Sequence, residues 1–370
     1  MFRILNGLHH TATGLDNLPA WFLRLGAPVF SEPLAKLLNL SLYTSVVPRQ
    51  WKSAVIRPVA KVGSARSHTD FRPISITPVL TRIMERSIVR HFLYPAFNQP
   101  PLSHLLNDQF AFRPTGSTTA AIVFILHTVT QMLNTNSYVT IIATDFSKGF
   151  DTVRHVTLLE KLAALDLPDH VYNWLVNFFS GRTQCTTFRE TTSELQKISA
   201  SIVQGSAIGP ASYVVNASDL KVVEAGNALC KYADDTYIII PSSNVDTRIE
   251  ELDNVERWAK VNNLTLNRAK CAELVIHDGR RKRQLVLPSP LLDVTRVQAL
   301  KVLGVTINHN LSVSDHVTNV IRSSAQTVHA LRLLRAHGMA DPSLHMVYRA
   351  VIVAQADVCC QCLVGYCICL

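Results

Sequence analysis

The feature that most constrains the fold of this 370-residue chain is the segment KYADDTYIII at residues 231–240. Its second half has the composition of a buried strand, yet Asp234 and Asp235 stand side by side at the entrance of that strand. Burying one ionised carboxylate is costly unless a cation or several hydrogen-bond donors meet it, and here there are two. The fold must therefore bring a cation or several hydrogen-bond donors to this point.

A third carboxylate, Asp145, follows a similar β-branched run at residues 138–144. If the two strands lie side by side, three carboxylates converge on one edge of a sheet, and they repel one another unless divalent metal is present. This arrangement matches a two-metal phosphoryl-transfer site, with Mg²⁺ ions roughly 3.5–4 Å apart and Mn²⁺ as a substitute. Successive strand residues point to opposite faces, so we expect unequal roles for Asp234 and Asp235. The competing interpretation is an ordinary turn, in which Asp is common.

Composition indicates a globular protein, with 48% hydrophobic and 17% charged residues, and the length predicts two or three subdomains. The formal charge of +9 favours an anionic partner such as nucleic acid. Residues 1–14 lack the continuous apolar core of a signal peptide, and no stretch approaches the roughly 20 apolar residues of a membrane span. A soluble protein of a reducing compartment, with no membrane partner, is the expectation.

A basic segment lies between Arg49 and Arg72, with six Lys or Arg residues against one acid, Asp70. Two short strands, at residues 55–61 and 72–76, are predicted around a loop at Gly63 and Ser64. The segment is either a solvated hairpin or an arm that grips phosphates.

Helices are predicted on both sides of these strands from apolar periodicity and breakers. Two short ones are expected within residues 15–47 and an amphipathic one over 81–97. A further helix is expected to begin at the hydroxyls of Ser117, Thr118 and Thr119, which suit capping or the binding of a phosphate, with capping favoured. Two more are expected within 155–181, and a long one over 314–338 ends at Gly338. The run KVLGVTIN at residues 301–308 predicts one further strand.

The eight cysteines are distributed unevenly, because five of them crowd the last twelve residues: Cys359, Cys360, Cys362, Cys367 and Cys369. Their spacing fits no common zinc pattern, so a tail without an evolved role is favoured over a structural zinc site.

Three segments in order, ATDFSKGFD, VQGSAIGP and KYADD, resemble motifs A, B and C of reverse transcriptases. Further segments, among them DFRPISITPVLTRIMER, NDQFAFRPTGSTTAA and LTLNRAKCAELV, resemble the polymerase of LINE-type (non-LTR, jockey-like) retrotransposons, and the similarity runs from about residue 14 to about residue 354. The resemblance implies an α+β right-hand polymerase fold: an N-terminal helical extension (1–48), fingers (49–137), an antiparallel palm sheet backed by helices (138–310), a partial helical thumb (311–358) and a Cys-rich tail (359–370).

The same resemblance implies roles for individual residues. Asp145 and Asp234 would be the principal ligands of two metal ions, with Asp235 beside them. The substrates would be dNTPs, an RNA template and a DNA primer whose 3′-hydroxyl is extended. The nucleotide would be bordered or held by Lys61, Arg72, the carbonyl of Phe146, the sugar-selecting ring of Phe150, Gln204, Gly205 and Lys270. Primer and template would meet Arg113, Leu303, Gly304 and Val305.

Three departures from the family pattern bear on activity. Gly149 stands where the family usually has alanine, which predicts impairment. The family's endonuclease domain is absent from this chain, so self-nicking of a target is not expected. The segment after Ala354 replaces an aromatic-rich continuation of the thumb, which predicts a weaker grip on template and primer.

Two alternatives follow from these sequences. One is a catalytically silent remnant that at most binds nucleic acid. The other is an RNA-dependent RNA polymerase, because Asp145 and Asp151 also satisfy a D-x₅-D spacing, although Phe150 and Ala233 argue against it. The family resemblance places the protein in the nucleus or the cytoplasm, and no targeting signal decides between them.

Overall fold

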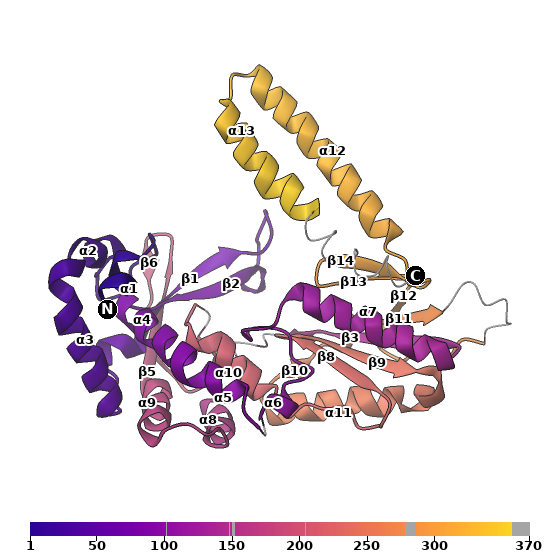
Figure 1. Cartoon of the computed structure of the whole chain (residues 1–370), viewed down its shortest axis with the longest axis horizontal. Coiled ribbons are helices and arrows are strands. Elements are labelled where there is room, and N and C mark those ends of the chain that lie inside the picture. Colours follow the sequence, from indigo (N-terminus) through magenta and orange to yellow (C-terminus); the bar gives the residue numbers. More distant parts are fainter. Residues whose placement is uncertain (101, 148, 150–151, 204, 278–285, 357–370) are drawn as a thin grey trace.

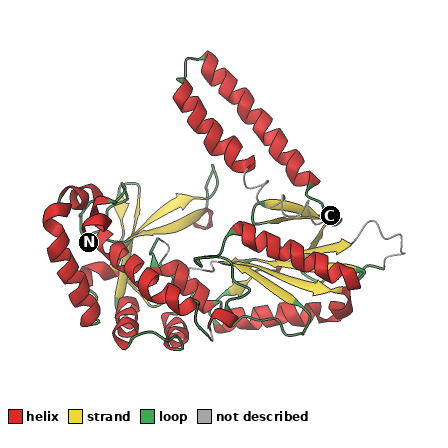
Figure 2. Cartoon of the chain, viewed as in Figure 1, coloured by secondary structure: helices red, strands yellow, loops and turns green. Residues whose placement is uncertain are grey.

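The computed structural model describes residues 1–370 apart from 101, 148, 150–151, 204, 278–285 and 357–370. Phe150, Asp151, Gln204 and the cysteine-rich tail therefore lie outside the described residues. Figure 1 shows an N-terminal part of helices and strands, a second sheet between helices, and a helix pair that projects away from both. Figure 2 shows two groups of strands in the body of the molecule, with helices packed around each.

The chain begins with three helices: α1 (Phe2–Asn6), α2 (Ala20–Leu25) and α3 (Ala27–Tyr43). The prediction of two helices within residues 15–47 is confirmed by α2 and α3, but α3, with 17 residues, is not short. Pro28 lies in the first turn of α3, where its missing N–H has no helical partner to lose. The indole of Trp174 donates to the Ser41 hydroxyl at 3.0 Å, which fixes α3 against α9 (Asp169–Phe179).

The basic segment forms the predicted hairpin of β1 (Ser53–Ala60) and β2 (Phe71–Ile76), which pair antiparallel. A strand that the sequence analysis did not predict, β5 (Arg182–Phe188), pairs parallel with β1. Two short strands, β6 (Thr191–Thr192) and β7 (Gln196–Ile198), pair with β5 and complete this sheet. The first sheet therefore joins chain segments from both sides of residue 138.

The predicted amphipathic helix over residues 81–97 is confirmed as α4 (Val79–Ile88), a π-helical turn (Val89–Leu93) and α5 (Tyr94–Phe97), with Ile83, Met84 and Ile88 buried. After α6 (Leu102–Leu105), α7 (Thr118–Thr135) begins where the hydroxyls were noted. The Ser117 hydroxyl accepts from the Ala120 N–H at 3.0 Å, so the capping interpretation is confirmed for Ser117.

The second sheet has the strand order β12-β11-β3-β9-β8. Its bounds are β3 (Tyr138–Thr144), β8 (Ala228–Tyr232), β9 (Asp235–Pro241), β11 (Ala272–His277) and β12 (Thr295–Val297). One face packs on α7 through residues such as Ile141 and Ile239. The other face carries Ile142 and Ile238 and packs in the core that α11 (Arg248–Val261) covers (Figure 1). Burial on both faces explains why β3 and β9 are almost continuously apolar.

Three more helices and two short strands connect these parts. They are α8 (His155–Ala163), α9, α10 (Ile208–Asn216), β4 (Phe146–Ser147) and β10 (Thr265–Leu266). The two helices predicted within residues 155–181 are confirmed by α8 and α9. The strands β4 and β10 pair antiparallel beside the second sheet.

The prediction of one strand over residues 301–308 is wrong, because β13 (Ala299–Val302) and β14 (Val305–Asn308) form a hairpin there. Leu303 and Gly304 both have positive φ, 46° and 98°, which turns the chain back in two residues. The long predicted helix is confirmed as α12 (Ser314–Ala336), after which Gly338 has φ 86°.

A second helix, α13 (Asp341–Val347), continues into a π-helical turn (Tyr348–Val353) and runs back along α12 (Figure 1). None of the α12 residues, all of which are described, is fully buried, and Ile321 remains 64% exposed. Among the described helices, none is both long and apolar enough to cross a bilayer.

Candidate active site

The sheet brings the three predicted carboxylates to one end of two neighbouring strands. Asp145 directly follows β3, and Asp235 is the first residue of β9. These strands pair antiparallel with Thr144 opposite Thr236, and the Thr144 hydroxyl donates to the Thr236 carbonyl at 3.1 Å. Asp145 therefore leaves the sheet beside the point where Asp234 and Asp235 enter it.

The turn between β8 and β9 sets the direction of the two adjacent aspartates. Tyr232 pairs with Asp235, so Ala233 and Asp234 form a two-residue turn. Of these two, Ala233 has φ 56° and Asp234 does not have positive φ, which is the pattern of a type II′ turn. A positive φ at alanine costs about 1–2 kcal/mol, and the paired strands on both sides hold it in place. In a regular strand, Asp234 and Asp235 would point to opposite faces of the sheet. The turn twists the chain at this point, so both can lie at the same end of the sheet.

Electrostatics couples the three carboxylates. Partial burial raises the pKa of Asp235 to about 6, although one side of the residue is open to solvent, and the charges of Asp234 and Asp145 add to that rise. Burial likewise raises the pKa of Asp234, the charge of Asp145 adds to it, and the positive charge of Arg72 opposes it. Such mutual repulsion is relieved when cations occupy the space between the groups.

The donor set fits hard divalent cations, since it consists of carboxylate oxygens. Among the residues that the structure describes, however, no three His, Cys, Asp or Glu side chains lie close enough together to hold one ion. Binding of cations would relieve the mutual repulsion of the carboxylates and draw them together.

The main chain of Asp145 is clamped by a segment that the sequence analysis had singled out only for Lys270. The Asp145 carbonyl accepts from the Asn267 N–H at 2.8 Å, and its N–H is hydrogen-bonded to the buried Cys271 thiol. The Lys270 ammonium lies 4.0 Å from the Asp145 carboxylate, and both side chains are largely exposed. The sequence analysis missed Asn267 and Cys271, because neither residue type by itself indicates a contact with Asp145. The contact becomes apparent only from the pairing of β4 with β10.

Phe146 is buried, and its ring meets Trp258 edge-on with the centroids 5.9 Å apart. This contact anchors the strand that follows Asp145, while the predicted role of Phe146 concerns its carbonyl. Tyr213 on α10 is a further neighbour that the sequence analysis missed. Burial raises its pKa, and the charges of Asp234 and Asp235 raise it further, so the phenol is neutral and lies near both carboxylates.

The structure gives one physical reason for a glycine at residue 205, and its predicted place beside the nucleotide stays a prediction. Gly205 has φ 107°, and a β-carbon there would collide with the carbonyl oxygen of Ser75 in β2. The close approach that Gly205 permits in the structure is therefore to the first sheet. Gly149 has no such conflict, because a β-carbon would lie 3.4 Å from Cβ of Asp234.

With this geometry established, similarity to known proteins decides the family. The family model "Reverse transcriptase (RNA-dependent DNA polymerase)" matches residues 59–307. The chain belongs to the reverse transcriptase family.

Curated relatives of this reverse transcriptase come from Drosophila mobile elements. The RNA-directed DNA polymerase from mobile element jockey of Drosophila melanogaster is 29% identical over 321 residues, 84% of this chain and 34% of the relative. The probable RNA-directed DNA polymerase from transposon BS of the same species is 27% identical over 319 residues, 81% of this chain and 34% of the relative. The chain thus spans about a third of the length of these relatives.

A solved structure supports the fold of the reverse transcriptase. Telomerase from Candida tropicalis, bound to a fragment of telomeric RNA, aligns with TM-score 0.51 and 13% identity, over 78% of this chain and 48% of that chain. The right-hand polymerase fold predicted from the sequence is confirmed, with sheets backed by helices. Reverse transcriptases generally use divalent metal ions, in agreement with the carboxylate set.

The predicted basic residues of the reverse transcriptase have different surroundings. The positive charge of Arg72 on β2 acts to lower the pKa of Asp234. Lys61 is exposed, and its ammonium donates to the Thr69 carbonyl at 2.9 Å across the hairpin loop. Arg113 is half-buried, with its guanidinium donating to the carbonyls of Leu106 and, at 3.3 Å, Gln109. Arg72 and Lys270 thus act on or lie near the carboxylates, whereas the contacts described for Lys61 and Arg113 are with main-chain carbonyls.

The turn at Leu303 and Gly304 lies against β9. The Leu303 main chain hydrogen-bonds to the Tyr237 hydroxyl, and burial together with the charge of Asp235 raises the pKa of that phenol. Val305 is fully buried in the core with α7. The turn is thus connected to the strand that begins with Asp235.

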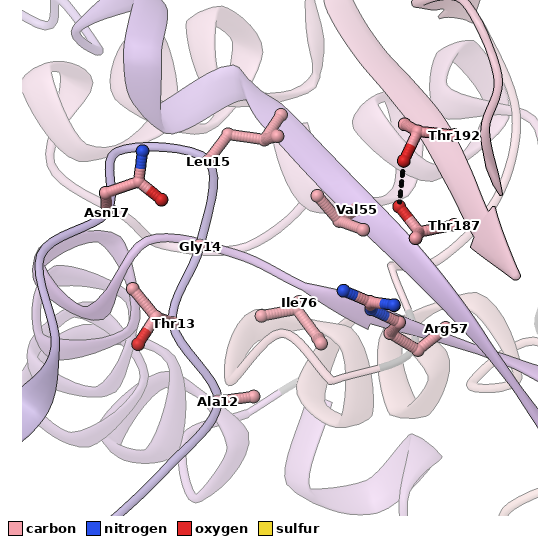
Figure 3. Close-up of a pocket in the computed structure, with 10 residues that line it drawn as sticks. All are labelled: Ala12, Thr13, Gly14, Leu15, Asn17, Val55, Arg57, Ile76, Thr187 and Thr192. Carbon is pink, nitrogen blue, oxygen red and sulfur yellow. Dashed lines mark hydrogen bonds between the residues drawn. The ribbon is translucent and has the colours of Figure 1, made fainter. Parts of the chain in front are cut away.

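A cavity of about 400 Å³ lies away from the carboxylates, between the loop at residues 12–17 and one face of the first sheet (Figure 3). Val55 and Arg57 of β1 and Ile76 of β2 line it. The Thr187 and Thr192 hydroxyls at its side bond each other at 3.0 Å. The ten described residues that line it include none of the predicted site residues.

Proposed function

We propose that this chain is an RNA-directed DNA polymerase that extends a primer 3′-hydroxyl with dNTPs. The observation that carries the proposal is the convergence of Asp145, Asp234 and Asp235 at one sheet end, where each of the last two has a raised pKa. The names of the Drosophila relatives, RNA-directed DNA polymerases of mobile elements, support RNA as the template.

In this proposal Asp145 and Asp234 hold two Mg²⁺ ions, which Mn²⁺ can replace, and Asp235 assists beside them. When bound, such ions lower the pKa of the attacking hydroxyl and stabilise the leaving oxygen. The primer 3′-oxygen forms a bond to the α-phosphorus, the bond from that phosphorus to the bridging oxygen breaks, and pyrophosphate leaves. The Tyr237 ring and the turn at Leu303 and Gly304 then flank the primer end.

The remaining residues orient the nucleotide and neutralise the charge of its phosphates. Arg72 faces the triphosphate, because its charge already acts on Asp234. Lys270, 4.0 Å from Asp145, is placed to protonate or neutralise pyrophosphate. Phe150, Gln204, Lys61 and Arg113 belong to the proposal through the family resemblance, and the carbonyl of Phe146 is a further ligand candidate. Placement and charge neutralisation supply most of the rate enhancement in such a site.

The proposal also assigns subdomains. Residues 49–137 are the fingers, 138–310 the palm and 311–358 a partial thumb, with 1–48 as an N-terminal helical extension. Because β5 pairs with β1, and β6 and β7 pair with β5, residues 182–198 complete the fingers sheet from within the palm segment. The projecting pair α12 and α13 is the thumb, and the net charge of +9 supports backbone binding of template and primer that weakens as salt rises.

A primer-extension assay tests the function. Purified protein with poly(A), oligo(dT), dTTP and Mg²⁺ is expected to incorporate dTMP, and Asp234→Asn to abolish incorporation. Asp166→Asn, at an exposed carboxylate between α8 and α9, is the matched control and should retain activity. Absence of incorporation by the wild type would contradict the proposal, and preference for UTP over dTTP would favour an RNA polymerase.

A further inference from the structure

Glu85 is a buried charge that the proposed mechanism does not use. It lies on α4, its exposed fraction is 0%, and it is surrounded by the core residues of that helix, among them Met84 and Ile88. A carboxylate that has lost its water must find donors in the protein, or it destabilises the fold by several kcal/mol.

Its donors lie on another element, in the turn at residues 205–208 (the 205–208 turn). The Ser206 hydroxyl donates to Oε2 of Glu85, as do the N–H groups of Ala207 at 2.6 Å and Ile208 at 3.3 Å. The last of these is the first residue of α10, so the carboxylate also faces the positive end of that helix.

A second charge supports the arrangement. Arg182, 1% exposed at the start of β5, stacks its guanidinium over the Phe178 ring at 4.4 Å. Burial raises the pKa of Glu85, whereas the Ser206 hydrogen bond, the Arg182 charge and the two N–H groups oppose that rise. Within the described part of the chain, Oε1 of Glu85 has no hydrogen-bond partner. All three described hydrogen bonds of this carboxylate are therefore accepted by Oε2.

The same turn is held from a second direction by the segment that leads into α4. Gly205 packs against the carbonyl of Ser75 in β2, three residues after Arg72. The stretch 75–85 therefore grips the 205–208 turn at both ends, through a backbone contact and through a carboxylate. Since Arg72 acts on Asp234, this grip joins the basic hairpin to the edge of the carboxylate site.

We propose that Glu85 is a positioning residue for the incoming dNTP, because it fixes the 205–208 turn against the first sheet and so keeps the nucleotide-bordering face of that turn in place. The inference rests on the proposed polymerase function. Glu85 touches neither substrate nor reacting atoms, so its removal should weaken nucleotide binding more than it slows the chemical step.

The test compares Glu85→Gln with Glu251→Gln. Glu251 is also buried (1% exposed) and also accepts main-chain donors, from Val223 at 3.0 Å and Glu224 at 2.9 Å, but on α11. Both variants should lose thermal stability to a similar extent. Only Glu85→Gln should raise the KM for dTTP, by about tenfold, with kcat within about threefold of the wild type, as expected when a charged hydrogen-bonded group loses its charge.

Ser206→Ala supplies a second measurement, in case Glu85→Gln does not fold. It removes one of the three donors and should raise the KM for dTTP by a smaller factor in the same direction, while the affinity for poly(A)–oligo(dT) stays unchanged. An equal KM for Glu85→Gln and Glu251→Gln, or for Ser206→Ala and the wild type, would overturn the positioning role. Inactive wild-type protein would instead overturn the polymerase function itself.

Discussion

Gly205 lies against the main-chain carbonyl oxygen of Ser75 so closely that no side chain fits between them. The contact ties the turn before α10 to β2, at a φ of 107° that residues other than glycine rarely adopt. Gly205→Ala is expected to destabilise the fold by about 1–3 kcal/mol from backbone strain, with the collision adding to this loss. Urea denaturation measures the change. Gly63→Ala is the control, because no described atom lies within 4 Å of its β-carbon position, and equal stability of both variants would contradict the prediction.

Lys270 is expected to act in catalysis and to contribute little to stability. Its ammonium lies 4.0 Å from the Asp145 carboxylate with both groups exposed, so the pair adds at most about 0.5 kcal/mol to the free energy of unfolding. Lys270→Gln should lower kcat by about 100-fold through loss of the acid or the charge. Single-turnover primer extension measures the rate. Lys260→Gln, which loses an exposed pair with Glu256, should retain the wild-type rate.

Asp235 is expected to make the metal-free protein pH-sensitive. Its folded pKa of about 6 lies above the usual value of 3.8, so its ionised form is disfavoured in the fold. The resulting loss of stability is present above pH 6 and disappears as pH falls below 4. In EDTA, Asp235→Asn should therefore raise Tm at pH 7.5, corresponding to about 1 kcal/mol after allowance for solvent screening. The gain should vanish near pH 4, as measured by thermal melts across pH.

Divalent metal should reverse the difference in Tm between Asp235→Asn and the wild type. Because Mg²⁺ would bind the ionised carboxylates, it should raise the Tm of the wild type at pH 7.5 more than that of Asp235→Asn. Asp166→Asn should respond to Mg²⁺ as the wild type does. An identical Mg²⁺ response in all three proteins would show that Asp235 contributes nothing to cation binding.

Gly149→Ala is expected to improve the enzyme. Its φ is not positive, and the added methyl group would make ordinary contact with Cβ of Asp234 at 3.4 Å. Replacing glycine there should stabilise the fold by about 0.4–1 kcal/mol, because the unfolded chain loses freedom, and should raise the rate of primer extension. Urea denaturation and primer extension at saturating dTTP measure both effects. A lower rate together with lower stability would show that the loop needs glycine.

Local patterns in the sequence predicted those parts of the fold that local chemistry determines. The hairpin β1–β2, the helix cap at Ser117 and the meeting of Asp145 with Asp234 follow from turn residues, capping hydroxyls and two apolar runs that each meet an acid. The predicted subdomain boundaries stay predictions.

The features that could not be predicted from the sequence are β5, the burial of Glu85 and the turn within residues 301–308. The first two depend on partners that are distant in the chain. The strand β5 has no strong apolar alternation, and its place beside β1 is set by tertiary pairing. Glu85 looks like a surface residue in the helical run TRIMERSI, and only the fold reveals the buried amides that it meets. The strand predicted at 301–308 is divided because Leu303 adopts a positive φ that its residue type disfavours.

The parallel pairing of β1 with β5 has a consequence for biosynthesis. Ser53 cannot meet Thr183 until the ribosome has released most of the intervening chain, so the edge of β1 stays unpaired for much of translation. An open strand edge in a nascent chain invites pairing with other chains. Pro58 and Arg57 within β1 reduce that hazard, since one lacks a donor and the other carries charge. Slow synthesis between residues 60 and 180 should therefore lower the yield of folded protein more than slow synthesis later in the chain.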